Sequence, residues 1–367
     1  MSDNLVPVVY DDQVFTFNRR GGVARYFTEL LRIYREDPGL GVEALTPFRY
    51  TVTEHLLELD PLCYRRAPLP EVLQRPRVLR PLNRMVARRS AESAHLMHHT
   101  HYFPQALTSQ ADHRVCTIYD MIPELFPEQF LHGNPHQAKR QYVDVCDAIL
   151  CISQSTKDDL LRVYGTLDKP VVVTPLGVAD HFFDARPEAD CPEYVLYVGQ
   201  RFDYKNFDVL LRSMALLGDT RPALSLVCVG PPFTETELAN QDELGVRSRV
   251  VRRAADDHEL PTVYASARCF VFPSRYEGFG LPIVEAFAAG CPTIVADMPC
   301  SIEVGGDSVL TFSTDDAEGL AVMIDRLVGD AAERERLAAA GRLRARTFSW
   351  RRTAELTRDV YREVSRS

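Results

Sequence analysis

Short runs of apolar residues without polar alternation recur along the whole chain. Examples are Val6–Tyr10, 148–152 and Tyr194–Val198, each followed by a polar loop. Such runs are typical of strands that are buried on both faces of a parallel sheet. The segments between them have the spacing of amphipathic helices, as in residues 23–35. The pattern therefore predicts an α/β protein with a parallel sheet in each half of the chain.

One stretch, residues 270–297, contains a complete strand–loop–helix–strand unit. Apolar residues 270–272 predict a buried strand, and residues 293–296 predict a second one. Between them, Pro282 stands where a helix would begin, because a missing N–H costs nothing in the first turn. Gly290 is placed to end that helix.

The loop of this unit carries the first candidate chemistry. Glu277 precedes the glycines Gly278 and Gly280, and Glu285 follows eight residues after Glu277. Backbone N–H groups at a helix N-terminus favour an anion, and glycine lets a ligand approach the backbone. Glu285 can accept hydrogen bonds from hydroxyls, as acidic residues do with ribose. The pattern predicts a phosphate-linked sugar as ligand, but a Glu that only complements the helix dipole fits the spacing equally.

The run Tyr276-Glu277-Gly278-Phe279-Gly280-Leu281-Pro282, followed by Glu285-Ala286, resembles the Glu-x7-Glu signature of retaining GT4 glycosyltransferases, mannosyltransferases among them. This resemblance implies the GT-B fold, in which two Rossmann-like domains face a central cleft and the C-terminal helix crosses back to the N-terminal domain. It also implies a catalytic role for Glu277 and donor binding by Gly278, Phe279, Gly280, Leu281 and Glu285.

The length of 367 residues is enough for two domains, each with its own core. We expect an acceptor domain in residues 1–183, completed by a crossing helix at 351–367, and a donor domain in 190–350. The polar stretch 184–192 is the candidate hinge. A net charge of −9 argues against nucleic acid as a partner.

The nine cysteines are scattered without a Cys-x-x-Cys pair, and most lie in or beside apolar runs. This usage is typical of a reduced, cytoplasmic protein. The sequence shows no signal peptide and no apolar run of about 20 residues, the length of a membrane span. We therefore expect a cytoplasmic protein, with peripheral membrane contact as the alternative.

Two cations flank the tight loop that follows the strand Tyr194–Val198. Arg201 and Lys205 stand before a predicted helix and could clamp a diphosphate, although two surface cations would show the same spacing. The segment resembles the Gly-Arg…Lys-Asn segment of the family, which implies that both stabilise the leaving nucleoside diphosphate. The same resemblance places Gly230 beneath the nucleotide and Arg253 in the loop that holds the base through main-chain groups.

In the N-terminal half, Gly21 and Gly22 form a strand-to-helix turn. Such a turn can bring N–H groups against a phosphate or serve only as a flexible connection. The resemblance assigns the pair to the donor diphosphate. Tyr119-Asp120 ends another strand where the family commonly has His-Asp. Tyr119 takes the place of that histidine as a candidate catalytic residue: tyrosine can donate a hydrogen bond but is a poor general base near pH 7. Asp120, also a candidate catalytic residue, could orient the acceptor hydroxyl.

A run of histidines, residues 98–101, suggests a metal site, but nearly consecutive side chains of a strand alternate between its faces. We expect no metal and a loop after a strand, in which His98 matches a family histidine on the acceptor side. Ser153 is expected to cap the helix that follows it. The resemblance adds a contact between Ser153 and the acceptor.

Eight arginines and one acid, Glu71, lie between residues 65 and 89. Such a run is either a solvated face or a surface for anions such as a membrane, and the sequence shows no clear amphipathic helix beside it.

Together these features predict a retaining, metal-independent hexosyltransferase. It would use a GDP-, UDP-, ADP- or TDP-sugar as co-substrate, no cofactor, and a sugar, lipid-linked or small-molecule acceptor. A phosphorylase or epimerase of the same fold and a non-catalytic nucleotide-sugar binding protein are the alternatives. The sequence does not indicate the oligomeric state.

Overall fold

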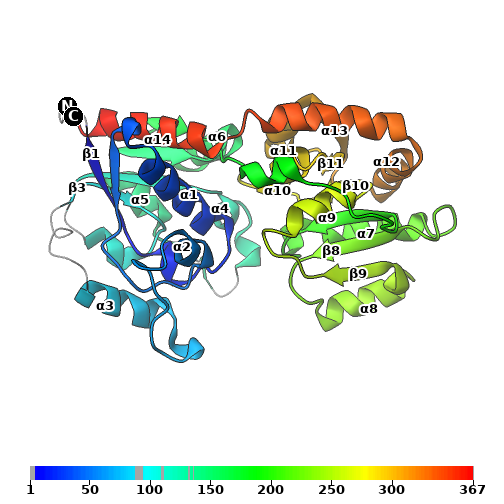
Figure 1. Cartoon of the computed structure of the whole chain (residues 1–367), viewed down its shortest axis with the longest axis horizontal. Coiled ribbons are helices and arrows are strands. Elements are labelled where there is room, and N and C mark those ends of the chain that lie inside the picture. The colour runs from blue at the N-terminus through cyan, green and yellow to red at the C-terminus, as the bar shows by residue number, and fades with distance from the viewer. Residues whose placement is uncertain (1–4, 87–93, 109–110, 131–132, 135, 367) are drawn as a thin grey trace. The chain divides into compact units, whose positions relative to one another are not determined.

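The computed structural model describes residues 5–86, 94–108, 111–130, 133–134 and 136–366. They form two compact units (Figure 1). The N-terminal unit extends to Leu176 and includes the C-terminal residues from Trp350 onward, and the C-terminal unit comprises Gly177–Ser349.

The N-terminal unit contains a parallel sheet with strand order β2-β1-β3-β4-β5-β6. Its strands are β1 (Val6–Tyr10), β2 (Val42–Leu45), β3 (Ala94–His99), β4 (Ala111–Ile118), β5 (Ala148–Cys151) and β6 (Val171–Val173). Its helices are α1 (Gly22–Glu36), α2 (Glu54–Leu59), α3 (Pro76–Val86), α4 (Ile122–Leu125), α5 (Lys139–Val145), α6 (Gln154–Tyr164) and α14 (Trp350–Val364).

The apolar runs that predicted central strands are indeed buried, as in β5, where every residue is inaccessible to solvent. The sequence did not indicate β2, an edge strand of four residues in which only Val42 is buried. A short strand with one covered face lacks the continuous apolar run on which the predictions depended.

The last helix, α14, belongs to the N-terminal unit, as expected for the crossing helix. Tyr34 on α1 donates a hydrogen bond to the carbonyl of Ala354 at 2.8 Å, and the hydroxyls of Tyr10 and Tyr361 lie 3.1 Å apart. His98 completes this contact: its Nδ1 lies 2.5 Å from the Tyr361 hydroxyl and its Nε2 lies 2.8 Å from that of Thr117. The helix is therefore held by polar contacts inside the core.

The C-terminal unit contains a second parallel sheet, with strand order β12-β11-β10-β7-β8-β9. Its strands are β7 (Tyr194–Val198), β8 (Ser225–Val229), β9 (Val250–Arg253), β10 (Cys269–Phe272), β11 (Thr293–Ala296) and β12 (Val309–Phe312). Its helices are α7 (Phe207–Leu216), α8 (Glu235–Glu243), α9 (Leu260–Ser266), α10 (Leu281–Ala288), α11 (Pro299–Gly305), α12 (Ala317–Gly329) and α13 (Ala331–Ala345). A single-turn 3-10 helix, η8 (Asp203–Lys205), precedes α7.

The boundary between the units lies earlier than the sequence suggested. Residues 177–183 were expected in the first domain, but they belong to the second unit. The reason is packing: Phe182 is fully buried beside Tyr264, with ring centroids 6.2 Å apart. The N–H of Val178 also donates to the carbonyl of Phe348 at 3.1 Å.

The arginine-rich run, 65–89, contains a helix that the sequence did not indicate. Helix α3 buries Leu79 and Asn83 on one side and exposes Arg77, Arg84 and Met85 on the other. Pro81 lies inside this helix, and because proline is unfavourable inside a helix, the sequence around it does not predict one. Across the parts of the chain that the structure describes, no helix is long and apolar enough to cross a bilayer.

The buried histidines of the N-terminal unit make its stability depend on pH. Burial lowers the pKa of His98 and of His101 from 6.5 to about 3. Below pH 6.5 the unfolded chain therefore binds protons that the folded unit does not. The free energy of unfolding consequently decreases as the pH is lowered. We expect a loss of about 1.4 kcal/mol per histidine for each pH unit below 6.5.

Urea unfolding at pH 7.5, 6.5 and 5.5 tests this, followed by the fluorescence of Trp350, the single tryptophan, which lies in this unit. Equal stability at pH 7.5 and 5.5 would show that these imidazoles are not held neutral.

Candidate active site

The second sheet changes its direction of growth between β7 and β10. The chain adds β8 and β9 on one side of β7, then returns to add β10, β11 and β12 on the other side. In parallel α/β sheets, ligands bind outside the carboxyl ends of the strands at such a switch point. The loops that follow β7 (199–206) and β10 (273–280) meet there, and both contain predicted site residues.

Lys205 and Glu277 face each other across these two loops. The Lys205 ammonium lies 2.5 Å from Glu277 Oε1, and the two side chains are 19% and 12% exposed. The loops are also joined through their backbones, since the N–H of Arg275 donates to the carbonyl of Tyr204 at 2.8 Å. Most of loop 273–280 is buried, but Glu277 is only half-buried. The structure thus brings together a cation and a carboxylate that lie 72 residues apart.

Helix α10 begins directly after this loop. Gly280 adopts a left-handed backbone conformation, with φ of 91°, which suits glycine, and no side chain caps the helix. Glu285 is buried in the second turn, where its carboxylate accepts a hydrogen bond from Tyr264 at 3.3 Å. Gly290 ends the helix with positive φ, as predicted. Pro282 has no N–H and the N–H of Ile283 donates to the carbonyl of Gly280 at 2.9 Å, so the first turn presents the N–H of Leu281 at the switch point.

The other predicted donor residues of this loop are buried or half-buried. Phe279 is buried, and its ring packs against Phe348 with centroids 5.6 Å apart. Gly278 is buried and Leu281 is half-buried at the first position of α10. A ligand here would meet backbone groups, because the Phe279 side chain is already used in the core.

Arg201 and Lys205, which are predicted to clamp one diphosphate, have different protein partners. The Arg201 guanidinium lies 2.5 Å from Glu237 on α8 and donates to the carbonyls of Pro231 and Pro232. Its side chain is only 3% exposed. Of the two cations, Lys205 alone is at the meeting point of the β7 and β10 loops. Arg201 instead joins the loop after β7 to the loop after β8.

Gly230, at the end of β8, allows these two loops to approach each other. A Cβ atom at this position would lie 2.4 Å from the carbonyl oxygen of Gly199 and 3.3 Å from Arg201 Nη1. Only glycine fits such a close backbone contact. Arg253, at the end of β9, forms an ion pair of 2.5 Å with Glu188, so its side chain is engaged within the unit.

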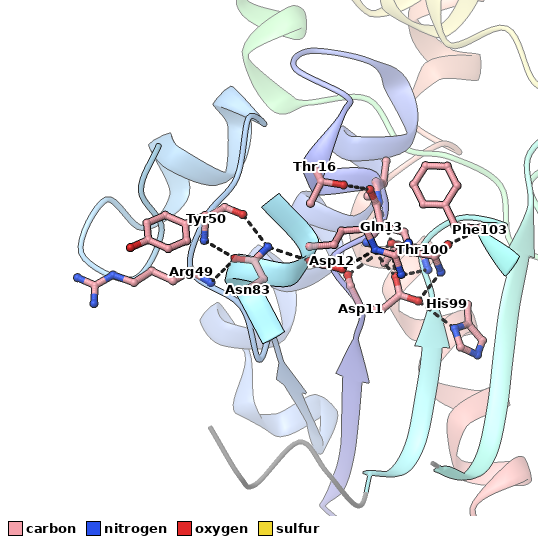
Figure 2. A network of polar contacts seen from close by, with 12 residues as sticks. Asp11, Asp12, Gln13, Thr16, Arg49, Tyr50, Asn83, His99, Thr100 and Phe103 are labelled. Carbon is pink, nitrogen blue, oxygen red and sulfur yellow. Dashed lines mark hydrogen bonds and ion pairs between the residues drawn. The ribbon is translucent and has the colours of Figure 1, made fainter. Parts of the chain in front are cut away.

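The first sheet has its own switch point, between β1 and β3, and a polar network occupies it (Figure 2). Asp11 follows β1 and accepts hydrogen bonds from His99, Thr100 and Gln13. Burial alone would raise the pKa of Asp11, but these hydrogen bonds hold it below its ordinary value. The sequence did not indicate this network, because its members lie at the ends of two strands that are far apart in the chain.

The same network reaches helix α3. Asn83 donates to Asp12 at 2.8 Å and accepts from the backbone N–H of Tyr50 at 2.8 Å (Figure 2). Arg80 also lies 3.5 Å from Asp12. The arginine-bearing helix is therefore attached to the carboxyl end of β1.

Tyr119 and Asp120 lie at the end of β4, as expected. The Tyr119 hydroxyl donates to the carbonyl of Thr100 at 3.1 Å, and burial raises the pKa of this tyrosine well above 10. It therefore stays protonated. Asp120 accepts from the N–H of Ile122, and its own carbonyl accepts from the fully buried Lys139. Lys139 also pairs with Glu124 at 2.8 Å, a contact that the sequence gave no sign of.

The expected position of His98 in a loop was wrong. His98 lies within β3 rather than in a loop, it is fully buried, and both ring nitrogens bind hydroxyls of the core. Ser153 is likewise buried and caps α6 by accepting from the N–H of Thr156 at 2.9 Å. Gly21 is the N-cap residue of α1, where its N–H donates to Asn18, and Gly22 is the first residue of the helix.

The histidines at the end of β3 do not gather around a common centre. His99 binds Asp11, and His101 packs against the rings of Phe17 and His136. Among the residues with a described placement, no three His, Cys, Asp or Glu side chains are arranged to hold a metal ion.

Both units match known glycosyltransferase families. Residues 20–182 match the model described as Glycosyltransferase Family 4, and residues 179–344 match the model of Glycosyl transferases group 1. O-antigen chain mannosyltransferase B of Escherichia coli is 28% identical over 81% of this chain and 81% of its own length. The MMP alpha-(1->4)-mannosyltransferase of Mycolicibacterium hassiacum is 31% identical over 59% of this chain. The chain spans 54% of that relative and 34% of the longer E. coli mannosyltransferase WbdA.

Solved structures confirm the expected GT-B class. Sucrose-phosphate synthase from Thermosynechococcus elongatus has a TM-score of 0.71 at 21% identity and covers 98% of both chains. Anabaena HepE, solved in complex with UDP and glucose, has a TM-score of 0.72 at 16% identity, covering 99% of this chain and all of the other.

The contact at Gly230 predicts a stability defect in Gly230→Ala. The added methyl group would overlap the carbonyl of Gly199, so the two loops must separate, at a cost of about 1–3 kcal/mol. Thermal denaturation should show a lower midpoint for the variant. Gly22→Ala is the matched control, since nothing lies within 4 Å of its added Cβ. An unchanged midpoint for Gly230→Ala would mean that the two loops are not in contact.

Proposed function

Because the chain is a glycosyltransferase with a family 4 domain followed by a group 1 domain, we propose that it transfers a hexosyl group from a nucleoside diphosphate sugar to an acceptor hydroxyl. The observation that carries this proposal is the position of Lys205. It stands at the switch point of the second sheet, beside Glu277 and near the uncapped start of α10. A cation and a backbone N–H at the start of α10 together suit a diphosphate.

Each residue of this site has a chemical role in the proposal. Lys205 neutralises the charge that grows on the leaving diphosphate, and the backbone N–H at the start of α10 donates a hydrogen bond to one of its oxygens. Glu277 holds the Lys205 ammonium in place before the donor binds. Glu285, which has a buried carboxylate, accepts hydrogen bonds from hydroxyls of the donor.

We further propose retention of configuration without a metal ion. The leaving phosphate accepts the proton of the acceptor hydroxyl on the same face of the sugar, while Lys205 supplies the positive charge. Tyr119 is unsuited to act as a base, because burial keeps its hydroxyl protonated. Asp120, at the end of β4, orients the acceptor hydroxyl. Gly21 and Gly22 are assigned to the donor diphosphate by resemblance alone.

The acceptor is proposed to be a sugar. The relatives named above include mannosyltransferases that build O-antigen chains, which makes mannose the first hexose to test. The base of the donor is left to a binding screen with UDP, GDP, ADP and TDP, since a bound ligand raises apparent thermal stability.

A peripheral membrane contact through α3 belongs to the same proposal. Arg77, Arg84 and Met85 are exposed on this helix, which combines positive charge with an apolar side chain. Such a surface suits anionic lipids. The attachment of α3 to Asp12 would then connect the lipid-facing helix to the first sheet.

Removal of the Lys205 charge should abolish most activity. We expect Lys205→Ala to lower kcat by a factor of about 100 or more, as when a preorganised charge-stabilising group is lost, and Lys205→Arg to retain part of it. Release of nucleoside diphosphate from UDP- and GDP-linked glucose and mannose, with methyl α-mannoside as acceptor, measures the effect. Half-buried Arg212, paired with Asp208, supplies the control Arg212→Ala. Normal turnover by Lys205→Ala would refute the assigned role.

The membrane contact predicts weaker binding to anionic vesicles after charge reversal on α3. We expect Arg77→Glu with Arg84→Glu to reduce binding to phosphatidylglycerol-containing vesicles at least about tenfold, since each basic residue contributes about 1 kcal/mol. Co-sedimentation at low and high salt provides the measurement. Arg212→Glu with Arg247→Glu changes the net charge equally in the other unit and should bind like the unaltered protein. Equal loss in both double variants would indicate a general charge effect.

A further inference from the structure

Lys139 lies where lysines rarely occur, with a side chain that is completely inaccessible to solvent. It is the first residue of α5, and its ammonium donates to the carbonyl of Asp120 and to Glu124 Oε2, both at 2.8 Å. The carboxylate of Asp120 lies 3.9 Å from the same nitrogen. One buried cation therefore contacts two acids of the segment that follows β4.

The three charged side chains of this cluster differ in exposure. The side chain of Lys139 is 0% exposed, that of Glu124 is 10% exposed and that of Asp120 is 20% exposed. Glu124 is also held at its other oxygen, because Oε1 accepts a hydrogen bond from the Tyr164 hydroxyl of α6 at 3.1 Å. Asp120 is thus the member of the cluster that an incoming group can reach, and the other two are enclosed.

Asp120 is fixed at both its main chain and its side chain. Its carbonyl binds Lys139, and its Oδ1 accepts a hydrogen bond from the N–H of Ile122 at 3.0 Å. Ile122 begins α4, the helix that also carries Glu124. The contacts from Asp120 through α4 and Lys139 back to Asp120 form a closed cycle. A carboxylate held in this way has its orientation before any ligand binds.

Stability alone does not account for a lysine at this position. Moving an ammonium and a carboxylate out of water costs several kcal/mol for each, and apolar residues often replace such a pair without loss of stability. Lys169 offers a comparison within the same unit. Its ammonium binds the carbonyls of Val143, Asp144 and Cys146 at the other end of α5, so it fastens this helix by its C-terminus.

We propose that Lys139 is a positioning residue for glycosyl transfer, acting through Asp120. Lys139 holds the Asp120 carboxylate in the orientation in which it accepts a hydrogen bond from the acceptor hydroxyl. The lysine itself is too deeply buried to touch the acceptor. This inference rests on the proposed function, because it assumes that Asp120 orients the acceptor hydroxyl.

The test measures transfer to methyl α-mannoside by Lys139→Met. Release of nucleoside diphosphate from UDP- and GDP-linked glucose and mannose gives kcat and the KM of the acceptor, and calorimetric titration with UDP and GDP gives the nucleotide Kd. We expect kcat/KM for the acceptor to fall at least about tenfold, since a displaced orienting group loses both affinity and rate. The nucleotide Kd should change less than about twofold. Lys139→Arg keeps a cation and should recover part of the loss.

A double-mutant cycle separates positioning from a general structural role. In an Asp120→Ala background, Lys139→Met should lower kcat/KM less than about twofold further, because no carboxylate is left to be positioned. A lysine that only stabilises the fold would lower kcat/KM by the same factor in both backgrounds.

Lys169→Met is the matched control. It removes the lysine that fastens the other end of α5, so it should lower the melting temperature without changing kcat/KM. If Lys139→Met does not fold, Lys139→Met with Glu124→Gln removes both charges, keeps an acceptor oxygen for Tyr164 and serves in its place.

Two results would overturn the proposal. In the first, Lys139→Met or its charge-free pair has the same kcat/KM for the acceptor as Lys169→Met. In the second, the factor lost to Lys139→Met is equal with and without the Asp120 carboxylate. Failure of the proposed function is distinguishable, because the unaltered protein would then release diphosphate from none of the donors, or Lys205→Ala would turn over normally, whatever the Lys139 variants do.

Discussion

The donor side of this protein depends on where β7 lies in its sheet. β7 is the first strand of the C-terminal unit, yet it ends up between β8 and β10. Chain growth must therefore reverse across β7, and the loops after β7 and β10 meet outside the carboxyl ends of two neighbouring strands. This arrangement places Lys205 opposite Glu277 and puts the uncapped start of α10 beside them.

Hydrogen bonds from neighbouring segments fix the loop that carries Lys205. Asn206 has a φ of 54°, an unusual value for a residue other than glycine, and its side chain donates to the carbonyl of Thr314 at 2.6 Å. Arg275 binds the carbonyls of Tyr204 and Asp203. A loop fixed in this way loses little further entropy when a charged ligand binds, which suits a site that acts by electrostatic stabilisation.

The sequence predicted those parts of the molecule that depend on local pattern. Continuous apolar runs located the central strands, Gly290 located the end of α10, and the spacing of Glu277 and Glu285 located the candidate donor site. Edge strands such as β2 were missed because a half-exposed strand of four residues has no distinctive pattern.

Contacts between distant segments could not be predicted in the same way. Glu237 is 36 residues from Arg201 in a helix of polar residues, so nothing in the sequence pairs them. The sequence predicted His98 as a site residue, but it is buried in the core, where its two ring nitrogens bind the hydroxyls of Tyr361 and Thr117. The buried pair of Lys139 and Glu124 was equally hidden, since both residue types usually lie on the surface.

A crystal structure of the protein with a bound nucleoside diphosphate tests the central claim most directly. The account predicts a phosphate oxygen within about 3 Å of Lys205 Nζ and of a backbone N–H at the start of α10. A diphosphate bound elsewhere, with the contact between Lys205 and Glu277 unchanged, would contradict it.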